Sequence, residues 1–272
     1  MKTTNHRWAH SIRPAIALLI AAMTLTCTAA RGQDDTDDEI LDEWKMVLLI
    51  NGGGTYGTPG FDSCVVSGSV TYDDNGHITL RNATIRAKEG LYFSFQGSAE
   101  SMQFVRSATD ISFTLEGENT IEITGQDKES AIFSEYGYMT FDGGNDGNGS
   151  LTIRMRNPEA KAIYAPQGAR ISNCQLTLEN ALYANGGIFF DNADVHVTRG
   201  GISCGYSYEF RDCVITHPQG ERPITMDKKH FDDVIICNPD RSKAEEVRIE
   251  RRKGTHLDVS KSESHSDWPI DN

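Results

Sequence analysis

The feature that most constrains this chain is a repeat of about twenty residues in its second half. Four aliphatic residues follow one another at steps of 19, 20 and 20 residues: Leu176, Val195, Ile215 and Ile235. Three residues before each of them stands Asn or Asp, and the residues two positions away on either side are mostly small or apolar. A fixed period of this length is typical of solenoid proteins.

The same pattern extends upstream around Ile85, Ile121 and Leu151. A second landmark, a small residue followed by an aliphatic one, also recurs, at Ala131-Ile132, Ala162-Ile163, Ala181-Leu182 and Gly201-Ile202. The segments between these landmarks are short, alternate in polarity with period two and are broken by Gly, Asn and Asp, which indicates strands rather than helices. We therefore expect an all-β fold, a right-handed parallel β-helix (solenoid).

Successive turns of such a solenoid lie about 4.8 Å apart, so equivalent residues stack in columns. Because side chains alternate along a strand, the aliphatic column and its neighbours at ±2 point inward, and we expect Val195 to lie between Leu176 and Ile215. The Asn/Asp column falls at a tight corner, where these residues tolerate a left-handed backbone and their amides can bond from turn to turn.

The chain divides into five segments on this basis: a signal peptide (1–32), an acidic flexible leader (33–43), a small N-terminal β cap (44–80), the parallel β-helix (81–240), and a C-terminal cap with a loose tail (241–272). In the last segment, residues 247–250 are expected to form a final strand. Caps are expected because an open solenoid end is a template for aggregation.

The N-terminus has the features of a secretion signal. Basic residues precede a 12-residue apolar segment, 15–26, which is too short to span a bilayer. We favour cleavage after Gly32, with Ala30 as the alternative. Cys27 raises the alternative of a lipid anchor, but residues 24–26 differ from the lipoprotein pattern. The expected location is therefore the periplasm, the cell surface or the medium.

Charge and cysteine content narrow the classes of partner. The net charge of −13 argues against nucleic acid, because phosphate binding needs a basic surface, and no later segment is apolar and long enough to cross a membrane. The oligomeric state stays open. Cys174 and Cys213 fall in one column two turns apart, too far for a disulfide, and are expected to stay free.

Three segments carry a resemblance to known proteins: residues 69–73, 78–85 and 113–121. Their order resembles that of secreted bacterial β-helix proteins labelled carbohydrate-binding, and is similar to that of the polygalacturonate-binding β-helix family. The resemblance spans about residues 45–237. It implies a β-helix that binds polysaccharide.

Some β-helix proteins are lyases or glycoside hydrolases, so an enzyme is the alternative. The polygalacturonase motifs Gly-His-Gly and Arg-Ile-Lys are absent, and Asp34-Asp35 lies in the leader. Asp191, Asp212 and Asp232 could meet on neighbouring turns, as a hydrolase would need, but two of them occupy the corner column. Arg199 and Arg211 could serve a lyase as bases, although nothing singles them out. We therefore favour a non-catalytic protein.

The polar segment 142–149 resembles a calcium loop, with Asp142, Asn145 and Asp146 as candidate ligands. It departs from the EF-hand pattern and from the Gly-Gly-x-Gly-x-Asp repeat. The alternative is an insertion between two turns, built from residues that tolerate positive φ. Ca²⁺ is thus a candidate cofactor of this loop, and no other cofactor is indicated.

Phe133, Tyr164 and Tyr183 follow the second landmark at equivalent positions. If the preceding aliphatic residues point inward, the three rings point outward and stack. Such a row suits the face of a sugar, whereas the alternative is that the rings only stabilise the sheet. The inverse orientation, with buried rings, is also open. The sequence thus predicts a secreted, non-catalytic β-helix that binds polysaccharide or acts at a surface; the alternatives are a polysaccharide lyase or hydrolase and a structural or adhesin-like protein.

Overall fold

A computed structural model describes residues 45–50, 54–73, 76–96, 110–134, 137–144, 146–220, 223–227 and 233–260. The predicted signal peptide, its Cys27, the acidic leader and the tail from residue 261 lie outside the described residues, as do Asn145 and Asp232.

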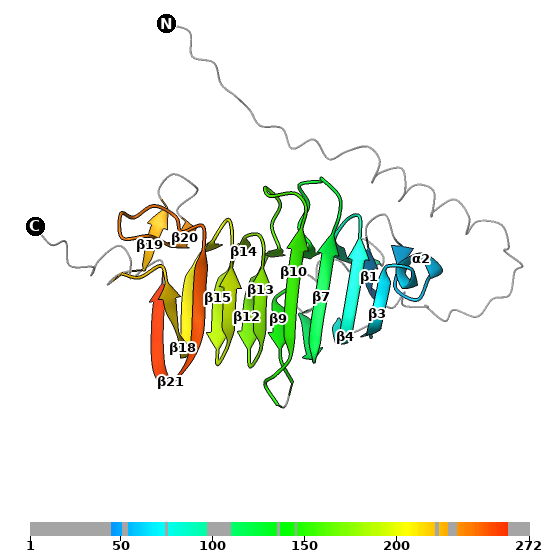
Figure 1. Ribbon diagram of the computed structural model, residues 1–272, viewed down its shortest axis with the longest axis horizontal. Helices are drawn as coiled ribbons and strands as arrows, with labels where there is room; N and C mark the ends of the chain where they lie inside the picture. Colours follow the sequence, from blue (N-terminus) through cyan, green and yellow to red (C-terminus); the bar gives the residue numbers. More distant parts are fainter. Residues whose placement is uncertain are drawn as a thin grey trace, which may run out of the picture. The chain divides into compact units, whose positions relative to one another are not determined.

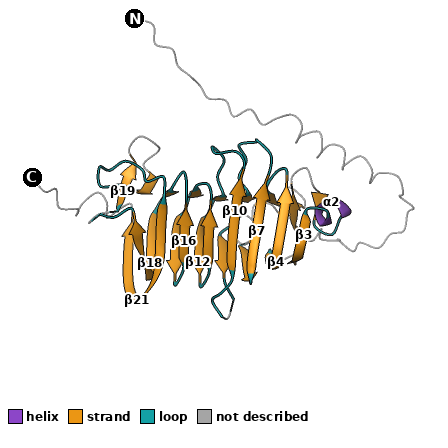
Figure 2. Ribbon diagram, viewed as in Figure 1, coloured by secondary structure: helices purple, strands orange, loops and turns teal. Residues whose placement is uncertain are grey.

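The described part of the chain is almost entirely β-structure (Figure 2). Its strands are β1 (Lys45–Ile50), β2 (Gly54–Thr55), β3 (Val65–Tyr72), β4 (His77–Ala87), β5 (Leu91–Gln96), β6 (Ile111–Glu116), β7 (Glu118–Ile123), β8 (Ile132–Ser134), β9 (Met139–Asp142), β10 (Ser150–Met155), β11 (Ile163–Ala165), β12 (Gly168–Ser172), β13 (Gln175–Leu178), β14 (Leu182–Ala184), β15 (Gly187–Asp191), β16 (Asp194–Val197), β17 (Ile202–Cys204), β18 (Ser207–His217), β19 (Ile224–Asp227), β20 (Asp233–Ile236) and β21 (Val247–Ser260). The short helix α2 spans Pro59–Asp62.

Parallel pairing stacks these strands into three faces, as a β-helix requires (Figure 1). We call β6, β9, β12, β15 and the first half of β18 the first face. The second face consists of β7, β10, β13 and β16. The third consists of β5, β8, β11, β14 and β17. Strand β4 joins the first two faces, because its start pairs with β6 and its end with β7. The predicted parallel β-helix is confirmed.

The predicted register holds in the middle of the solenoid and is displaced by two residues upstream. Leu176 pairs with Val195 and with Leu151, as expected. Ile121, however, pairs with Ile153 and not with Leu151. A shift of two leaves every side chain on the same face, so alternation in polarity cannot distinguish the two registers.

The corner column has the backbone that its residue types favour. Asn82, Asn173, Asn192 and Asp212 all have positive φ, between 46° and 51°. Between two of these corners the side chains also bond, because Asn192 Nδ2 donates to Asn173 Oδ1 at 3.0 Å. The predicted left-handed corner and its amide contact are therefore confirmed.

The C-terminal end departs from the predicted repeat. Ile235 does not begin another parallel turn, because β20 pairs antiparallel with β17 on the third face, with Ile235 opposite Ser203. On the second face β21 lies between β16 and the end of β18, so Ile249 pairs with both Val195 and Ile215. Val195 is buried as predicted, but its neighbours are Leu176 and Ile249.

The strand beside Val195 differs from the predicted one because β21 offers apolar residues to the core where the repeat offers polar ones. The repeat would have placed Asp233 and His217 inward, where an unpaired polar group is costly. Strand β21 instead presents Val247 and Ile249, both fully buried, while the end of β18 becomes a half-exposed edge. An antiparallel strand with two apolar residues therefore follows β16 on the second face, and the end of β18 forms the edge beyond it.

The N-terminal end is closed by a β cap, as expected, with one short helix added. β3 and β4 form an antiparallel hairpin, and β1 pairs antiparallel with β5. The hydroxyl of Thr58 caps α2, whose Phe61 is buried against the core. Inward phenylalanines stack between turns, such as Phe113 on Phe141 at 4.8 Å between ring centroids.

Four described cysteines form no disulfide: Cys64, Cys174, Cys204 and Cys213. Cys174 and Cys213 are thus unbridged, as predicted, and each thiol donates to a backbone carbonyl, of Phe141 and Phe190 respectively. Within the described residues, no helix is both apolar and long enough to cross a membrane.

Candidate functional site

The predicted aromatic residues form a row on the outer surface of the third face. Tyr164 pairs with Phe133 and with Tyr183, and all three rings are partly exposed. The aliphatic residues before them are fully buried, which establishes the outward orientation. Tyr92 extends the row at its N-terminal end, where it pairs with Phe133. We call Tyr92, Phe133, Tyr164 and Tyr183 the aromatic stack.

Tyr92 was not among the predicted residues, although it follows the same pattern of a small residue, Gly90, an aliphatic residue, Leu91, and then an aromatic one. The spacing hid it. Tyr92 and Phe133 are 41 positions apart, against 31 from Phe133 to Tyr164 and 19 from Tyr164 to Tyr183. Only the pairing of β5 with β8 brings Tyr92 into the column.

The rings of the aromatic stack lie face to face. Successive ring centroids are 5.2, 5.2 and 5.6 Å apart, and the ring planes differ by 22°, 6° and 12°. The faces of Phe133 and Tyr164 are thus covered by neighbouring rings, so that solvent meets their edges. A sugar needs a ring face on which to stack, and this geometry therefore favours a stabilising role for the aromatic stack.

Polar side chains surround the C-terminal end of the aromatic stack. The ammonium of Lys161 lies 5.6 Å from the ring centroid of Tyr164 and 5.3 Å from that of Tyr183. Asn185 Nδ2 donates to the hydroxyl of Tyr164 at 2.9 Å. Burial, together with the charge of Asp233, raises the pKa of Tyr183 to about 12. These contacts hold the two tyrosines in place.

A separate hollow lies on the outer surface of the first face. It has a volume of about 480 Å³. The hollow is lined by residues of β12, β15 and β18 and by Tyr138, which directly precedes β9. The lining residues are Tyr138, Arg170, Gly187, Ile188, Phe189, Ser207, Glu209 and Arg211. We call it the Phe189 hollow. Sequence analysis named only Arg211 among its residues.

Parallel register brings these residues together. Arg170, Phe189 and Glu209 occupy equivalent outward positions on three successive strands. Gly187 lies beside them without a side chain, and Ser207 packs closely against it, since a Cβ atom there would lie 2.7 Å from the hydroxyl of Ser207. The hollow therefore lies between the large side chains of Arg170, Phe189 and Glu209 and the small residues Gly187 and Ser207, which lie two positions earlier on β15 and β18.

Phe189 organises the two arginines of the hollow. The guanidinium carbon of Arg170 lies 4.4 Å from its ring centroid and that of Arg211 lies 5.2 Å away, both in cation–π geometry. Arg170 also donates to Asp191 at 2.9 Å and to Ser172 at 2.9 Å. Arg211 donates to Glu209 at 3.2 Å. Each guanidinium in the hollow is thus paired with one carboxylate.

Tyr138 forms one wall of the hollow and is fixed at its hydroxyl, which donates to the backbone carbonyl of Ala169 at 2.9 Å. Burial raises the pKa of Tyr138. The phenol therefore stays protonated at neutral pH, and the oxygen that donates this bond keeps acceptor capacity for a ligand.

The predicted calcium loop shows internal bonding. Asp142 accepts from the backbone N–H of Gly144 at 2.8 Å, and Asp146 accepts from that of Asn148 at 3.1 Å. Gly144 and Gly147 have positive φ, as in an insertion between turns. The described residues contain no group of three or more His, Cys, Asp or Glu that could hold a metal ion. With Asn145 outside them, calcium binding stays a prediction.

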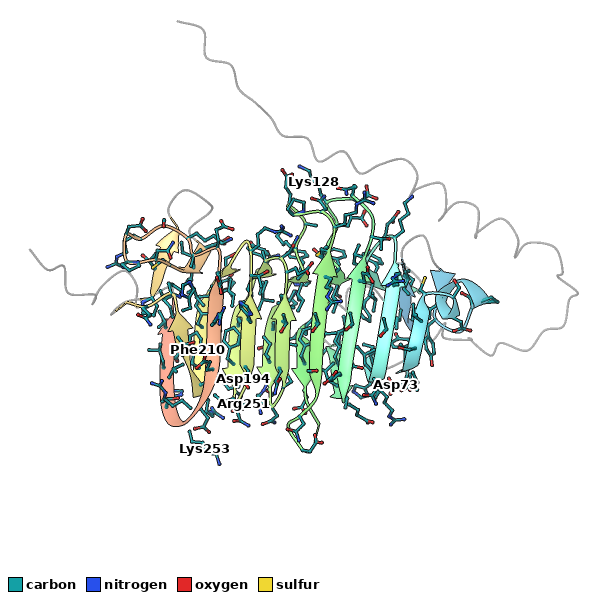
Figure 3. All side chains as sticks on the ribbon, viewed as in Figure 1. Asp73, Lys128, Asp194, Phe210, Arg251 and Lys253 are labelled. Atoms are coloured by element: carbon teal, nitrogen blue, oxygen red, sulfur yellow. The ribbon has the colours of Figure 1, made fainter. Side chains whose placement is uncertain are left out.

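Arg251 reaches this loop from β21 (Figure 3). Its Nη2 donates to the carbonyl of Gly147 at 3.1 Å, and its Nε lies 3.2 Å from Asp194 Oδ2. The Nε has no aligned hydrogen bond, so its contact with Asp194 is an ion pair only. A cationic side chain of the protein therefore already contacts one carbonyl of the loop.

The residues considered for an enzyme have structural partners. Asp191 is paired with Arg170, and Asp212 accepts from the backbone N–H of Gly254 at 2.6 Å. Arg199 donates to Asn180 at 2.7 Å. Asp232, the third carboxylate considered, lies outside the described residues.

Comparisons with protein-family models, with curated proteins and with solved structures found no match for this chain.

Proposed function

We propose that the protein is a secreted, non-catalytic β-helix that binds a polysaccharide, and that the Phe189 hollow is its binding site. The observation that carries the proposal is the hollow itself, in which two guanidiniums, a carboxylate, a serine and a tyrosine surround an outward phenylalanine. A small number of polar groups around an apolar surface is the usual composition of a ligand site.

The polar groups of the hollow suit sugar hydroxyls. A guanidinium has five N–H donors, and the bonds to Asp191, Ser172 and Glu209 use only some of them on the two arginines. The carboxylate of Glu209 and the hydroxyl of Tyr138 offer acceptors beside these donors. Neighbouring hydroxyls of a sugar can therefore be donors to one group and acceptors from the next.

Binding is favoured over cleavage by the pairing of the carboxylates. A glycoside hydrolase needs two carboxyl groups that act as acid and base or nucleophile. In the hollow, Glu209 and the adjacent Asp191 are each held by an arginine. Such pairs hold the two carboxylates in place, which suits recognition.

Tyr206 is an exposed aromatic residue that directly precedes a lining residue of the hollow in the sequence. It directly precedes the lining residue Ser207, so their Cα atoms lie about 3.8 Å apart, and its side chain is 65% exposed. Unlike the two middle rings of the aromatic stack, which are only partly exposed, it is one of the exposed large hydrophobic side chains of the described residues. We expect Tyr206 to contribute a ring face to sugar binding.

A glycan array combined with a reducing-end release assay tests the function. Binding without release supports the proposal, release supports a lyase or hydrolase, and the absence of any binding at millimolar concentration supports a structural protein. For a glycan that binds, Arg170→Ala should weaken the affinity by about tenfold or more, in the range of binding hot spots.

Arg86→Ala is the matched control for this variant. Arg86 also forms an outward ion pair, with Glu122 at 2.8 Å, but on the second face. Both substitutions remove one positive charge and one ion pair. Arg170→Ala also removes the contacts with Phe189 and Ser172, so thermal unfolding should verify that both variants are folded. Equal affinities of the two variants would place the binding site elsewhere than in the Phe189 hollow.

A further inference from the structure

We infer that the Phe189 hollow selects an uncharged sugar over an acidic one such as a uronic acid. This inference rests on the proposed function, and it concerns the charge of the ligand. The arginines of the hollow are held in ion pairs, so their number alone does not give the net charge that a ligand meets.

The charges of the hollow cancel when Asp191, which lies beside it and pairs with Arg170, is included. Arg170 is paired with Asp191 and Arg211 with Glu209, which gives two positive and two negative groups. Guanidinium donors are therefore present without an excess of positive charge. An anionic ligand would have to separate one of these pairs or add a third negative group beside the two carboxylates.

The next strand makes the surroundings more negative. In β21, Asp258 lies opposite Glu209, and His256 lies opposite Arg211. Asp258 adds a carboxylate beside the one that lines the hollow, and the whole chain carries a net charge of −13. The field at the hollow is thus unfavourable to an anion at short and at long range.

An uncharged sugar meets neither obstacle. Its hydroxyls can bond to the remaining guanidinium donors and to the carboxylate oxygens while both ion pairs stay intact. Binding should then depend little on salt, because no net charge is neutralised.

The test compares polymers that share a sugar stereochemistry and differ in charge, such as matched hexose and hexuronate chains of the gluco, galacto and manno series. We expect the neutral member of the recognised series to bind at least about tenfold more tightly. Its affinity should change less than about twofold between low and physiological salt.

Glu209→Gln provides the complementary variant. It keeps the size of the side chain and removes one negative charge, so the hollow gains a net positive charge beside Arg211. We expect the ratio of acidic to neutral affinity to rise by about tenfold at low salt. Glu122→Gln is the control, because Glu122 also pairs with an arginine and is 33% exposed, against 34% for Glu209.

The outcomes separate the two proposals. The inference is supported if the protein prefers the neutral polymer and if the ratio of acidic to neutral affinity rises in Glu209→Gln but not in Glu122→Gln. Tighter binding of the acidic polymer, or no shift in Glu209→Gln, overturns the inference and leaves polysaccharide binding in place. Failure of both members of every series to bind overturns polysaccharide binding itself. Thermal unfolding of both variants verifies that each is folded.

Discussion

At the scale of single residues, the corner column shows how a side chain selects a backbone conformation. Asn192 has a φ of 48° and its amide bonds to Asn173. For most L-residues a left-handed conformation costs about 1–2 kcal/mol, whereas Asn, Asp and Gly adopt it readily. The corner therefore requires one of a few residue types, which is why it was visible in the sequence.

The first prediction compares two substitutions at this corner. Asn192→Ala should lower the free energy of unfolding by about 1–2 kcal/mol more than Asn192→Gly, because both lose the amide bond but only alanine is strained. Urea denaturation measures the difference. Equal destabilisation by the two variants would show that the left-handed backbone contributes nothing to the effect.

The buried thiols give a second prediction at this scale. Burial raises the pKa of Cys174 and of Cys204 to about 12 and that of Cys213 to about 11. In the unfolded chain a thiol ionises near pH 9. The folded protein therefore holds these protons more tightly, and their contribution to stability is complete below pH 9 and is lost as the pH rises towards 12.

We expect the urea midpoint to fall between pH 9 and pH 11, and Cys174→Ala to reduce that fall. At pH 8, a thiol reagent should modify the partly exposed Cys64 and leave Cys174 and Cys213 unmodified until the protein unfolds. Rapid modification of all the cysteines of the folded protein would contradict the burial on which both expectations depend.

At the scale of structural elements, the aromatic stack joins neighbouring turns on the outer surface by stacked rings, as the inward phenylalanines do in the core. Its rings pair across β5, β8, β11 and β14, and such pairs contribute about 0.5–1.5 kcal/mol each beyond the burial of their area. We therefore expect the double variant Tyr164→Ala/Tyr183→Ala to lose about 2–3 kcal/mol of stability and to keep its affinity for a glycan.

Tyr206→Ala is the control for the double variant and should behave in the opposite way. Its side chain is mostly exposed, so its removal should leave the melting temperature nearly unchanged and weaken glycan binding. Calorimetry and a binding titration on both proteins decide between the two surfaces. Loss of affinity in the double variant alone would assign sugar binding to the aromatic stack.

Strand β21 supports a prediction about the C-terminal cap. Ile249 is 1% exposed between Val195 and Ile215, whereas Leu257 in the same strand is 43% exposed. Ile249→Asp would bury an unpaired carboxylate and should cost several kcal/mol, while Leu257→Asp should cost less than about 1 kcal/mol.

The alternative for this cap is the register of the sequence repeat, with Ile215 directly beside Val195. In that arrangement β21 would not contribute to the core, and both aspartate variants would unfold at nearly the same urea concentration. A large difference between them therefore supports the inserted position of β21.

At the scale of the whole molecule, stability comes from contacts between neighbouring turns, as in other solenoids. The antiparallel strands at the two ends therefore decide how far the parallel stack extends. In the described part of the chain, β3 and β1 close one end, and β20 and β21 close the other.

The net charge of −13 gives the prediction at this scale. Repulsion among the excess carboxylates opposes folding, and exposed ion pairs contribute only about 0–1 kcal/mol each. We expect the urea midpoint to rise when salt is increased from about 10 mM to about 150 mM. A fall would show that the ion pairs between turns outweigh the repulsion.

Much of the fold could be predicted because its signals are local and repeated. The inward aliphatic residues and the left-handed corners are each set by neighbours within a few positions, and repetition reveals them. The outward direction of the rings was one of two orientations that the sequence left open, and the burial of the aliphatic residues before them decided it. Where turns are irregular the prediction weakened, as at Ile121, which is placed two residues off, and at Tyr92, which was missed.

By itself, the sequence determined the class of fold, the inward direction of the repeated aliphatic side chains and the free state of Cys174 and Cys213. Only the tertiary structure decided that Ile249 displaces Ile215 beside Val195 and that Arg170, Phe189 and Arg211 share one hollow. Period-two alternation says which face a residue occupies, but not which strand comes next to it. Because an antiparallel strand from a distant part of the chain can complete a sheet as well as the next repeat can, the choice depends on which of them better fills the core.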